Sequence, residues 1–396
     1  MSLVRLNLQT AGESHGPALI SILDGLPAGI PVDPMIVDRD LARRQAGYGR
    51  GGRMKIESDK AEFLSGVRGG RTLGSPIAIR IENLDHSTWR GVMSPFEVDE
   101  NASARRRVFA PRPGHADLAG GQKWGARDLR DVLERSSARE TASRVAAGAL
   151  AKIFLGVFGI EIRSGVVAIG GVGPGAEAEL TLRFSDLPDA GDSSPLRLVD
   201  RSLEAAAITA IDGAFKDGNT LGGICAIAAR GIPPGLGSSF DWDKKLDGRL
   251  GQALLSIHAV KAVSIGDGIA ASRRRGSEVH DPIEHDGSRG YRRTSNRAGG
   301  LEGGITNGEE LVALIHMKPI STLRQGLPSV DIDTKEAHAS NYERSDVTAL
   351  PACGVVAEAM MALVLADAFL EKFGGDALTE TRRNFEGYQR QLSSSP

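Results

Sequence analysis

Two glycine-rich motifs each occur twice in this chain, in the same order. Residues 25–29 (GLPAG) and 231–235 (GIPPG) share the pattern G-[LI]-P-x-G, and residues 66–74 (GVRGGRTLG) and 300–308 (GLEGGITNG) share the pattern GxxGGxTxG. A strand-like apolar run precedes each copy of the first motif and follows each copy of the second. This order predicts two related halves built on one strand–helix plan. The alternative is a chance match, because the chain contains 50 glycines.

Apolar periodicity predicts the elements around these motifs. From Ala142 to Val157 the apolar residues recur three and four apart, which predicts a helix whose alanines pack closely against another helix. Asp33 followed by Pro34 predicts the start of a further helix. Other helices are predicted near 203–215, 246–257 and 356–369, and strands near 4–8, 18–22, 77–81, 166–169, 224–228 and 311–315. We expect residues 97–111 to form a mobile loop, because three arginines stand there among turn formers.

The composition disfavours several classes of protein. A net charge of −2 and an aromatic content of 5% speak against a nucleic-acid-binding module. The longest apolar stretch, Met360–Ala366, lies between Glu358 and Asp367 and is too short to span a bilayer. Cys225 and Cys353 have no metal-binding or redox spacing, which predicts buried thiols in a reducing compartment and no bound metal. No signal-peptide pattern is present at the N-terminus, so we expect a cytoplasmic protein.

The stretch from Arg112 to Glu140 combines several groups that can bind or protonate an anion. His115 stands in a Pro-Gly-His turn beside Arg112, and Arg135 begins the run RSSARE, in which Ser137 and Glu140 match a capping box. A helix that opened there would offer free N–H groups, hydroxyls and two arginines to an anion. The alternative is that Ser137 only caps the helix and that the arginines are solvated.

Arginines cluster in three other segments. They lie at 39–55, where the run ends in GYGRGGR, at 105–107, and in an insertion at 273–297 whose role we cannot assign. Arginines on a glycine-rich loop can grip an oxyanion through paired hydrogen bonds, although a solvated basic loop is the alternative. No GxxxxGK[ST] nucleotide loop is present, and the glycine run at 171–176 contains a proline and lacks a following helix. The residues alone therefore predict an enzyme that binds a polyanionic small molecule.

Seven motifs give the chain a specific resemblance to the chorismate synthase family. They are GESHG (12–16), LARRQAGYGRGGRM (41–54), RPGHAD (112–117), LERSSARETA (133–142), SNRAGGLEGGITNG (295–308), MKPIST (317–322) and RSDV (344–347). The resemblance implies an α+β fold, a β-α-β sandwich with helices enclosed between antiparallel sheets, and a homotetramer. We expect one domain at 1–385, with pseudo-halves of roughly 1–160 and 161–385, and a frayed tail at 386–396.

The resemblance also implies a reaction. Members of the family convert 5-enolpyruvylshikimate 3-phosphate to chorismate and phosphate by a 1,4-elimination, the last step of the shikimate pathway toward aromatic amino acids. They require reduced FMN although no net redox change occurs, because a reduced flavin can lend electron density and accept the hydrogen at its N5. NADPH enters at most as an indirect reductant, and the family's link of Arg44 and Arg50 to a reduced nicotinamide dinucleotide is the weaker interpretation. Since no fused reductase domain is recognisable, we expect an external flavin reductase.

The resemblance assigns individual residues to this chemistry. His15 is expected to be the general acid for the departing phosphate, and His115 to stabilise or protonate the reduced flavin near N1, although these roles could be exchanged. Asp346 is expected to help deliver hydrogen to N5; the alternative is a cap of the approaching helix. The expected substrate-binding residues are Arg44, Arg50, Arg53, Arg112, Arg139 and Arg344. The expected FMN-binding residues are Arg135, Ser136, Ser137, His258, Ala259, Gly303, Lys318, Pro319, Ile320, Ser321, Thr322 and Arg344, with His258 acting through its backbone.

Two other functions remain open at this point. The first is a phosphoryl-transfer enzyme or a phosphate lyase without flavin; the missing nucleotide loop and the lack of clustered carboxylates for magnesium count against phosphoryl transfer. The second is a non-catalytic nucleic-acid-binding module that uses the arginine loops, which the near-neutral charge disfavours.

Overall fold

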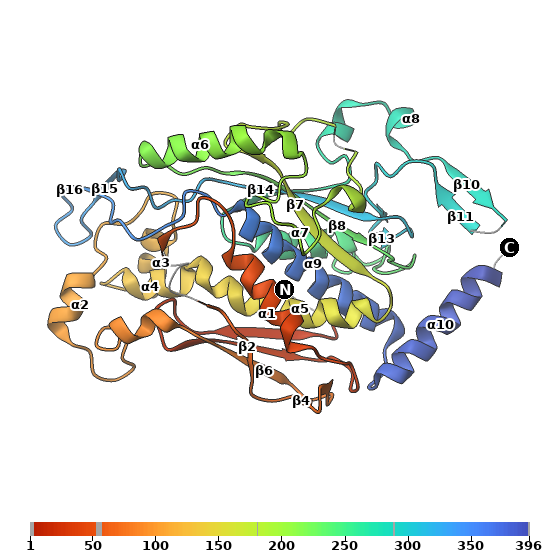
Figure 1. Cartoon of the computed structure of the whole chain (residues 1–396), viewed down its shortest axis with the longest axis horizontal. Helices are drawn as coiled ribbons and strands as arrows, with labels where there is room; N and C mark the ends of the chain where they lie inside the picture. Colours follow the sequence, from red (N-terminus) through yellow and green to blue (C-terminus); the bar gives the residue numbers. More distant parts are fainter. Residues whose placement is uncertain (1–3, 53–57, 180, 288–289, 395–396) are drawn as a thin grey trace.

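The structure is a computed structural model that describes residues 4–52, 58–179, 181–287 and 290–394. It is an α+β fold in which helices lie between two four-stranded sheets (Figure 1). The helices are α1 (Pro34–Gln45), α2 (Glu100–Arg106), α3 (Asp117–Trp124), α4 (Arg130–Ser136), α5 (Thr141–Gly156), α6 (Glu204–Lys216), α7 (Leu246–Leu255), α8 (Gly276–Val279), α9 (Leu350–Phe373) and α10 (Leu378–Ser394).

Both four-stranded sheets are antiparallel. The first has the order β1-β2-β6-β3, with β1 (Asn7–Ala11), β2 (Ala18–Asp24), β6 (Ile77–Glu82) and β3 (Glu62–Phe63). The second has the order β7-β8-β14-β9, with β7 (Glu161–Ile169), β8 (Gly223–Arg230), β14 (Leu311–Met317) and β9 (Val260–Ile265). In each sheet, the strand that precedes the G-[LI]-P-x-G motif pairs with the strand that follows the GxxGGxTxG motif.

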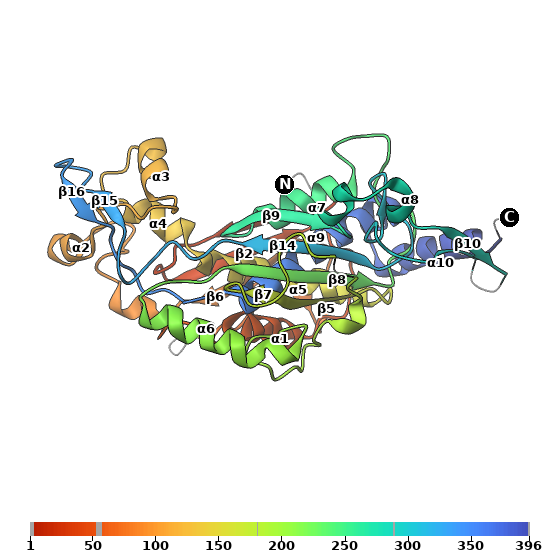
Figure 2. The same ribbon diagram turned by 90° about the horizontal axis from the view of Figure 1, so that it is seen from above.

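Four short hairpins complete the described strands. They are β4 (Val67–Arg68) with β5 (Arg71–Thr72), β12 (Leu301–Glu302) with β13 (Ile305–Thr306), β10 (Ile283–Asp286) with β11 (Gly290–Arg293), and β15 (Pro328–Val330) with β16 (Ala337–Ala339). Seen from above, α2 and the β15–β16 hairpin lie at one end of the molecule, and α10 and the β10–β11 hairpin lie at the other (Figure 2).

Helices α5 and α9 form the centre of the helical layer. A Cβ atom added at Gly148 of α5 would lie only 2.3 Å from the Cβ of Ala359 on α9, so the two helix backbones approach closely. This confirms the close packing predicted from the alanines of α5. Helix α9 is long and apolar enough to span a membrane, but its whole hydrophobic stretch is buried inside the fold, as befits a core helix.

Two of the three carboxylates on α9, Glu358 and Asp367, are fully buried and bind other parts of the chain. Glu358 accepts hydrogen bonds from Arg43 (2.7 Å) and Lys152 (2.7 Å). Burial alone would raise the pKa of Glu358, but the charges of Lys152 and Arg43 lower it overall, so the group stays ionised. Asp367 accepts the backbone N–H groups of Arg5 and Leu6, both at 2.7 Å, and so anchors the segment that leads into β1.

Two predictions about irregular segments are wrong. Residues 97–111, expected to form a mobile loop, contain α2, whose N-cap Asp99 accepts the N–H of Ala102 at 3.0 Å. The tail expected to fray from residue 386 stays helical to Ser394. The ring of Phe385 packs on Phe369 and Phe373, and the hydroxyl of Tyr388 donates to the carbonyl of Pro234 (3.1 Å), so α10 is held against the body. By contrast, the cap predicted at Asp33 is confirmed, since its carboxylate accepts the N–H of Met35.

Candidate active site

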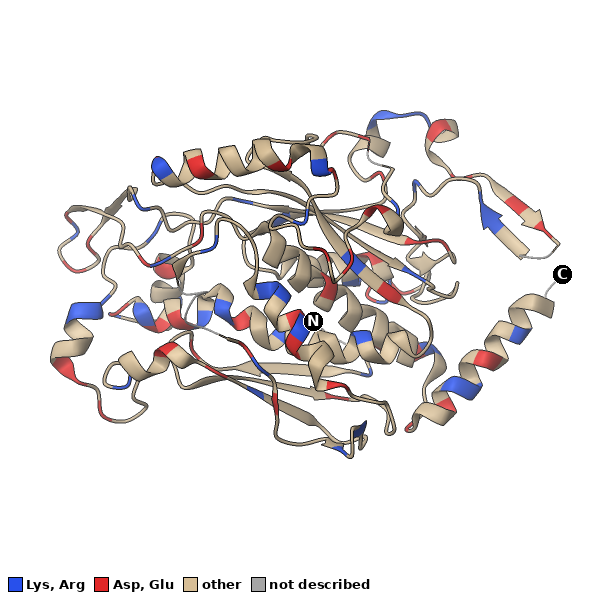
Figure 3. Ribbon diagram, in the orientation of Figure 1, with Lys and Arg blue, Asp and Glu red and all other residues tan. Residues whose placement is uncertain are grey.

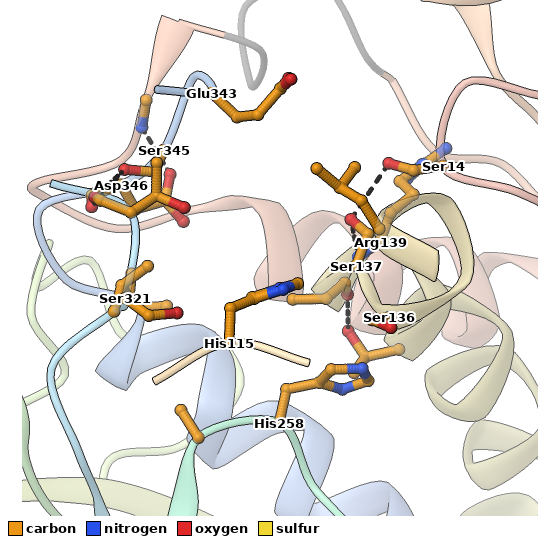
Figure 4. A pocket seen from close by; sticks show the side chains of 18 of the residues that line it. Ser14, His115, Ser136, Ser137, Arg139, His258, Ser321, Glu343, Ser345 and Asp346 are labelled. Atoms are coloured by element: carbon orange, nitrogen blue, oxygen red, sulfur yellow. Dashed lines mark hydrogen bonds between the residues drawn. The ribbon is translucent and has the colours of Figure 1, made fainter. Parts of the chain in front are cut away.

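Loops from both sheets and the start of α9 enclose a cavity of about 730 Å³ (Figure 4). The first half of the chain contributes the β1–β2 turn, the end of α1 and the residues from 112 to 141. The second half contributes residues 257–259 before β9, residues 317–322 after β14 and residues 342–346. Apolar side chains on the first turns of α9 (Ala352, Cys353 and Val356) form one wall of this cavity.

His15 lies in the β1–β2 turn and is held by Glu134 of α4. The Nδ1 atom of His15 lies 2.8 Å from Oε1 of Glu134, while Oε2 accepts the backbone N–H of His15 at 2.8 Å. An ionised carboxylate can only accept, so Nδ1 carries the hydrogen and Nε2 is the atom left for proton transfer. Burial alone would raise the pKa of Glu134, but its hydrogen bonds with His15 lower it overall. Trp89 stacks on the imidazole with ring centroids 3.9 Å apart.

His115 is paired with a carboxylate in the same way. Its Nδ1 atom lies 2.6 Å from Oδ1 of the fully buried Asp117. Asp117 also accepts from Nε (2.8 Å) and Nη2 (2.9 Å) of Arg112, and Nη1 of Arg112 donates to Thr322 (2.8 Å). Burial alone would raise the pKa of Asp117, but these contacts with His115 and Arg112 hold it well below its usual range. Most N–H groups of the Arg112 side chain therefore donate to Asp117 and Thr322 inside the protein, and Asp117 in turn positions His115.

Arg139, also expected to bind substrate, is occupied as well. It donates to both oxygens of Asp59, at 2.6 and 2.7 Å, and to the side chain of Asn83 at 2.9 Å. Its side chain is only 2% exposed, although it borders the cavity. We infer that Arg139 shapes the cavity by fixing the segment around Asp59.

Arg44 is the arginine best placed to receive an anion. Its Nε donates to Thr141 (2.9 Å) and its Nη2 to the carbonyl of Ala138 (2.9 Å). The buried Nη1 lies 3.5 Å from Oδ2 of Asp59 but makes no hydrogen bond to any described residue. Burial, together with the charges of Arg139 and Arg50, lowers the pKa of Arg44 to about 9. A bound anion would supply the missing acceptor and favour the charged guanidinium.

Arg50 and Asp346 form an ion pair at the rim of the cavity. Nη1 of Arg50 lies 2.9 Å from Oδ2 of Asp346, whose Oδ1 accepts the N–H of Gly51 at 2.6 Å. Arg344 is half exposed and donates to Asp85 at 2.8 Å. Arg53 lies outside the described residues.

The helix start predicted at Arg135 is wrong. Arg135 and Ser136 form the last turn of α4, and α5 begins at Thr141 after a short 3₁₀ turn. Among the described residues the predicted capping box does not form, because the side chain of Ser137 accepts the N–H of Arg139 (3.3 Å) and not that of Glu140, while the carboxylate of Glu140 binds Thr10 and Arg144. The α4–α5 junction nevertheless borders the cavity through both serines, and Ser137 accepts a hydrogen bond from Ser14 (3.0 Å; Figure 4).

The residues expected to bind FMN divide into two groups. Those that border the cavity are Ser136, Ser137, His258, Ala259, Lys318, Ile320, Ser321, Thr322 and Arg344. Arg135, Pro319 and Gly303 do not line it, and Arg135 donates to Thr10 behind the wall. Gly303 lies in the β12–β13 hairpin beside Ser239, near the α10 end of the molecule (Figure 1). Gly303, which the sequence predicts to bind FMN, therefore does not border the cavity of its own chain.

His258 differs from the other two histidines because no carboxylate among the described residues holds its ring. Its Nδ1 is buried without a hydrogen-bond partner. Burial is the largest cause that lowers the pKa of His258, to about 4, so the ring is neutral near pH 7. An unpartnered Nδ1 on the cavity wall is a polar atom that a ligand can satisfy.

Four residues of the site were missed by the sequence analysis. Glu134 and Asp117 hold the histidines, Trp89 covers His15, and Asp59 anchors Arg139. Glu134 and Asp117 stand inside the motifs LERSSARETA and RPGHAD, so a search for carboxylate partners of the two histidines could have found them. Trp89 and Asp59 lie in segments without any motif, and no spacing points to them.

Comparison with known proteins decides which family has this architecture. The family model described as chorismate synthase matches residues 6–370. The chain belongs to the chorismate synthase family. It is 54% identical over 387 residues to the chorismate synthase of Symbiobacterium thermophilum, covering 97% of this chain and 98% of that protein. It is 52% identical over 390 residues to that of Geobacter sulfurreducens, covering 97% and 98%.

A solved structure agrees with the family assignment. The structure titled "Crystal Structure of Chorismate Synthase" superposes with a TM-score of 0.80 at 41% sequence identity, over 100% of both chains. The chain is thus a lyase of the shikimate pathway, which converts 5-enolpyruvylshikimate 3-phosphate to chorismate and phosphate on the route to aromatic amino acids. The expected membership of the chorismate synthase family is confirmed.

Proposed function

We propose that the chain performs this elimination with reduced FMN bound in the cavity that His15 and His115 line. Two features of the described residues fit such a cofactor. The α9 wall of Ala352, Cys353 and Val356 offers an apolar surface to a flat ring. Among the described residues, the buried Nδ1 of His258, which borders the same cavity, has no hydrogen-bond partner, so a bound ligand could supply one. When bound, reduced flavin would lend electron density to the departure of phosphate and take up the ring hydrogen.

The observation that carries this proposal is the pair of histidine–carboxylate contacts in one cavity. In each pair the carboxylate fixes the tautomer, so Nε2 is the atom that can hold or move a proton. We assign His15 to the leaving phosphate oxygen, because the same cavity is bordered by Arg44, whose Nη1 makes no hydrogen bond to any described residue. We assign His115 to the flavin side, because it lies beside the turn at 318–322, where Lys318 donates to the carbonyl of Gly114 at 2.9 Å. The two assignments remain exchangeable.

For Asp346 we propose a positioning role toward Arg50. Their ion pair keeps the guanidinium at the rim, where an incoming carboxylate or phosphate can meet it. The expected transfer of hydrogen by Asp346 would require this pair to open. Arg44, Arg50 and Arg344 remain our proposed substrate contacts, while Arg112 and Arg139 act through the groups that they hold.

The decisive experiment is phosphate release from 5-enolpyruvylshikimate 3-phosphate under anaerobic conditions, with and without photoreduced FMN. Release that occurs only with reduced FMN supports the proposal. Release that is equally fast without flavin would leave the site a flavin-independent phosphate lyase. We propose an external flavin reductase as the source of electrons, and turnover of the pure protein with NADPH and oxidised FMN would contradict that.

We further propose a cytoplasmic homotetramer, in which Gly303 could contact flavin only from a second copy. Gly303 borders the segment 238–242, which exposes Phe240 and Trp242 to solvent by 95% and 84%. Exposed aromatic side chains of this size favour an interface between subunits. Sedimentation equilibrium tests the assembly: a single monomeric species at micromolar concentration would refute it.

We also propose that the chain consists of two related halves that form a β-α-β sandwich. The matching strand orders of the two sheets support this, as does the position of each duplicated motif relative to them. The alternative nucleic-acid-binding function has no comparable support, since basic and acidic residues are interspersed in the view of Figure 3.

A further inference from the structure

Trp89 separates the active-site cavity from a second cavity of about 340 Å³. His15 stacks on the indole with centroids 3.9 Å apart, and the guanidinium carbon of Arg106 lies 3.8 Å from the ring centroid. Two groups this close to one ring must occupy its opposite faces. The indole of Trp89 is therefore a wall shared by the active-site cavity and the second cavity.

Five arginines line this second cavity: Arg105, Arg106, Arg107, Arg130 and Arg344. Three of them have carboxylate partners within the described ranges. Arg107 pairs with Asp333 (2.7 Å), Arg130 with Glu134 (3.1 Å) and Glu343 (2.7 Å), and Arg344 with Asp85 (2.8 Å). Their charges are thus compensated inside the protein.

The other two arginines are not compensated. Across the part of the chain that the structure describes, neither Arg105 nor Arg106 has a carboxylate within ion-pair distance, and the buried Nη1 of Arg106 has no hydrogen-bond acceptor. A buried N–H donor without an acceptor is unfavourable, and two uncompensated positive charges that line one cavity favour a negative ligand there. An oxyanion would relieve both, because its oxygens accept several N–H groups at once.

We propose that the arginine-lined cavity behind Trp89 is a second binding site for a phosphate group, apart from the place of substrate in the main cavity. The proposal rests on the family's phosphate-releasing reaction, which supplies the ligand in two forms. One is the phosphate group of incoming 5-enolpyruvylshikimate 3-phosphate, and the other is the inorganic phosphate that leaves. Either form is a tetrahedral oxyanion with up to two negative charges, which matches the two uncompensated arginines.

The test uses the full chain without flavin, so that substrate binds but does not react. Isothermal titration measures the dissociation constant of substrate, and then that of inorganic phosphate added to the substrate-saturated protein. Arg105→Gln is the test variant, because Arg105 is exposed and it is the neighbouring Arg106 that stacks on Trp89. Arg90→Gln is the matched control, because Arg90 is exposed, next to Trp89, and lines neither cavity.

Loss of one charge-assisted contact should weaken binding about tenfold. If the site serves released phosphate, inorganic phosphate binds to the substrate-saturated protein and Arg105→Gln weakens that binding, whereas Arg90→Gln does not. If it serves incoming substrate, Arg105→Gln raises the dissociation constant of substrate itself and added phosphate does not bind. The proposal is overturned if Arg105→Gln equals Arg90→Gln in both titrations. Because no turnover is measured, this outcome is independent of whether reduced FMN supports phosphate release.

Discussion

In both histidine–carboxylate pairs a buried carboxylate holds the imidazole ring, but the surroundings of the two pairs differ. Both imidazoles present Nδ1 to a buried carboxylate, at 2.8 Å for His15 and 2.6 Å for His115. Glu134 binds His15 twice, through the ring and through the backbone N–H, and Trp89 stacks on the ring. His115 shares its carboxylate with Arg112, and its backbone N–H donates to the carbonyl of the same arginine at 3.1 Å. The orientation of His15 is thus fixed by several contacts, whereas that of His115 depends on a carboxylate that also stabilises a buried cation.

Replacing the histidines should have the largest effect on turnover. We expect His15→Ala and His115→Ala each to lower kcat by about 10²–10⁴-fold, because each removes a group that moves or holds a proton. The dissociation constant of substrate should change little. Single-turnover phosphate release with photoreduced FMN and titration of substrate measure the two quantities. A normal kcat in either variant would remove that histidine from the mechanism.

Replacing the carboxylates should separate the two pairs by stability. Asp117→Asn leaves the buried guanidinium of Arg112 without its anion, and we expect a loss of about 3 kcal/mol in the free energy of unfolding. Glu134→Gln should cost less, because Arg130 keeps Glu343 as a partner at 2.7 Å. Urea denaturation of both variants makes the comparison. Equal losses would show that Arg112 does not depend on Asp117.

The same pair predicts how acid acts on the protein. The folded pKa of Asp117 is lowered, so its contribution to stability is full above the unfolded pKa of about 4 and disappears as the pH falls below it. Asp117→Asn should therefore flatten the acid side of the stability profile. A profile of the same steepness in the variant would show that other carboxylates dominate acid unfolding.

Arg50→Ala should act on binding and leave proton transfer intact. Arg50 borders the cavity but pairs with Asp346, not with either histidine. We expect the dissociation constant of substrate to rise about tenfold to a hundredfold, with a smaller change in kcat than in the histidine variants. Arg39→Ala is a suitable control, because Arg39 is half exposed and does not line the cavity. A normal dissociation constant in Arg50→Ala would contradict its assignment.

The duplicated motifs show which parts of the fold could be predicted from the sequence. In the first half, the hydroxyl of Thr72 donates to the carbonyl of Pro27 at 2.6 Å. In the second half, that of Thr306 donates to the carbonyl of Pro233 at 2.7 Å. Gly25 and Gly231, which open the proline motifs, both have positive φ, and a Cβ there would lie within 2.0 and 2.2 Å of a carbonyl oxygen. The same threonine–proline contact thus joins the two motifs in each part of the chain, and the residues that make it stand at matching positions of motifs that are visible in the sequence.

The site was less predictable because its contacts join distant segments. The sequence named both histidines and the arginines through family motifs, but it could not show that Asp59 occupies Arg139 from 80 residues away. Nor could spacing reveal that Trp89 stacks on His15. The prediction of a helix start at Arg135 was wrong for a related reason. The carboxylate of Glu140 binds Thr10 and Arg144 and so does not form the predicted capping box. Tertiary contacts between distant segments determine where these side chains lie, and local sequence patterns cannot predict such contacts.

The third histidine of the cavity, His258, tests whether a carboxylate partner distinguishes the histidines that take part in the reaction, and its replacement should have the smallest effect. His258 has no carboxylate on its ring, and its pKa of about 4 is below the value of about 6.5 in an unfolded chain. The unfolded state thus binds a proton first, so this residue supports folding fully above pH 6.5 and loses that contribution as the pH falls toward 4.

His258→Gln should remove that dependence, an effect of about 1–3 kcal/mol across the window, and should lower kcat at neutral pH far less than His15→Ala does. Chemical denaturation at a series of pH values measures it. The control is His338→Gln, an exposed histidine outside the cavity, whose profile should match the unmodified chain. If His258→Gln instead lowers kcat as far as His15→Ala does, His258 uses its ring in the reaction, and a carboxylate partner is not what distinguishes the working histidines of this site.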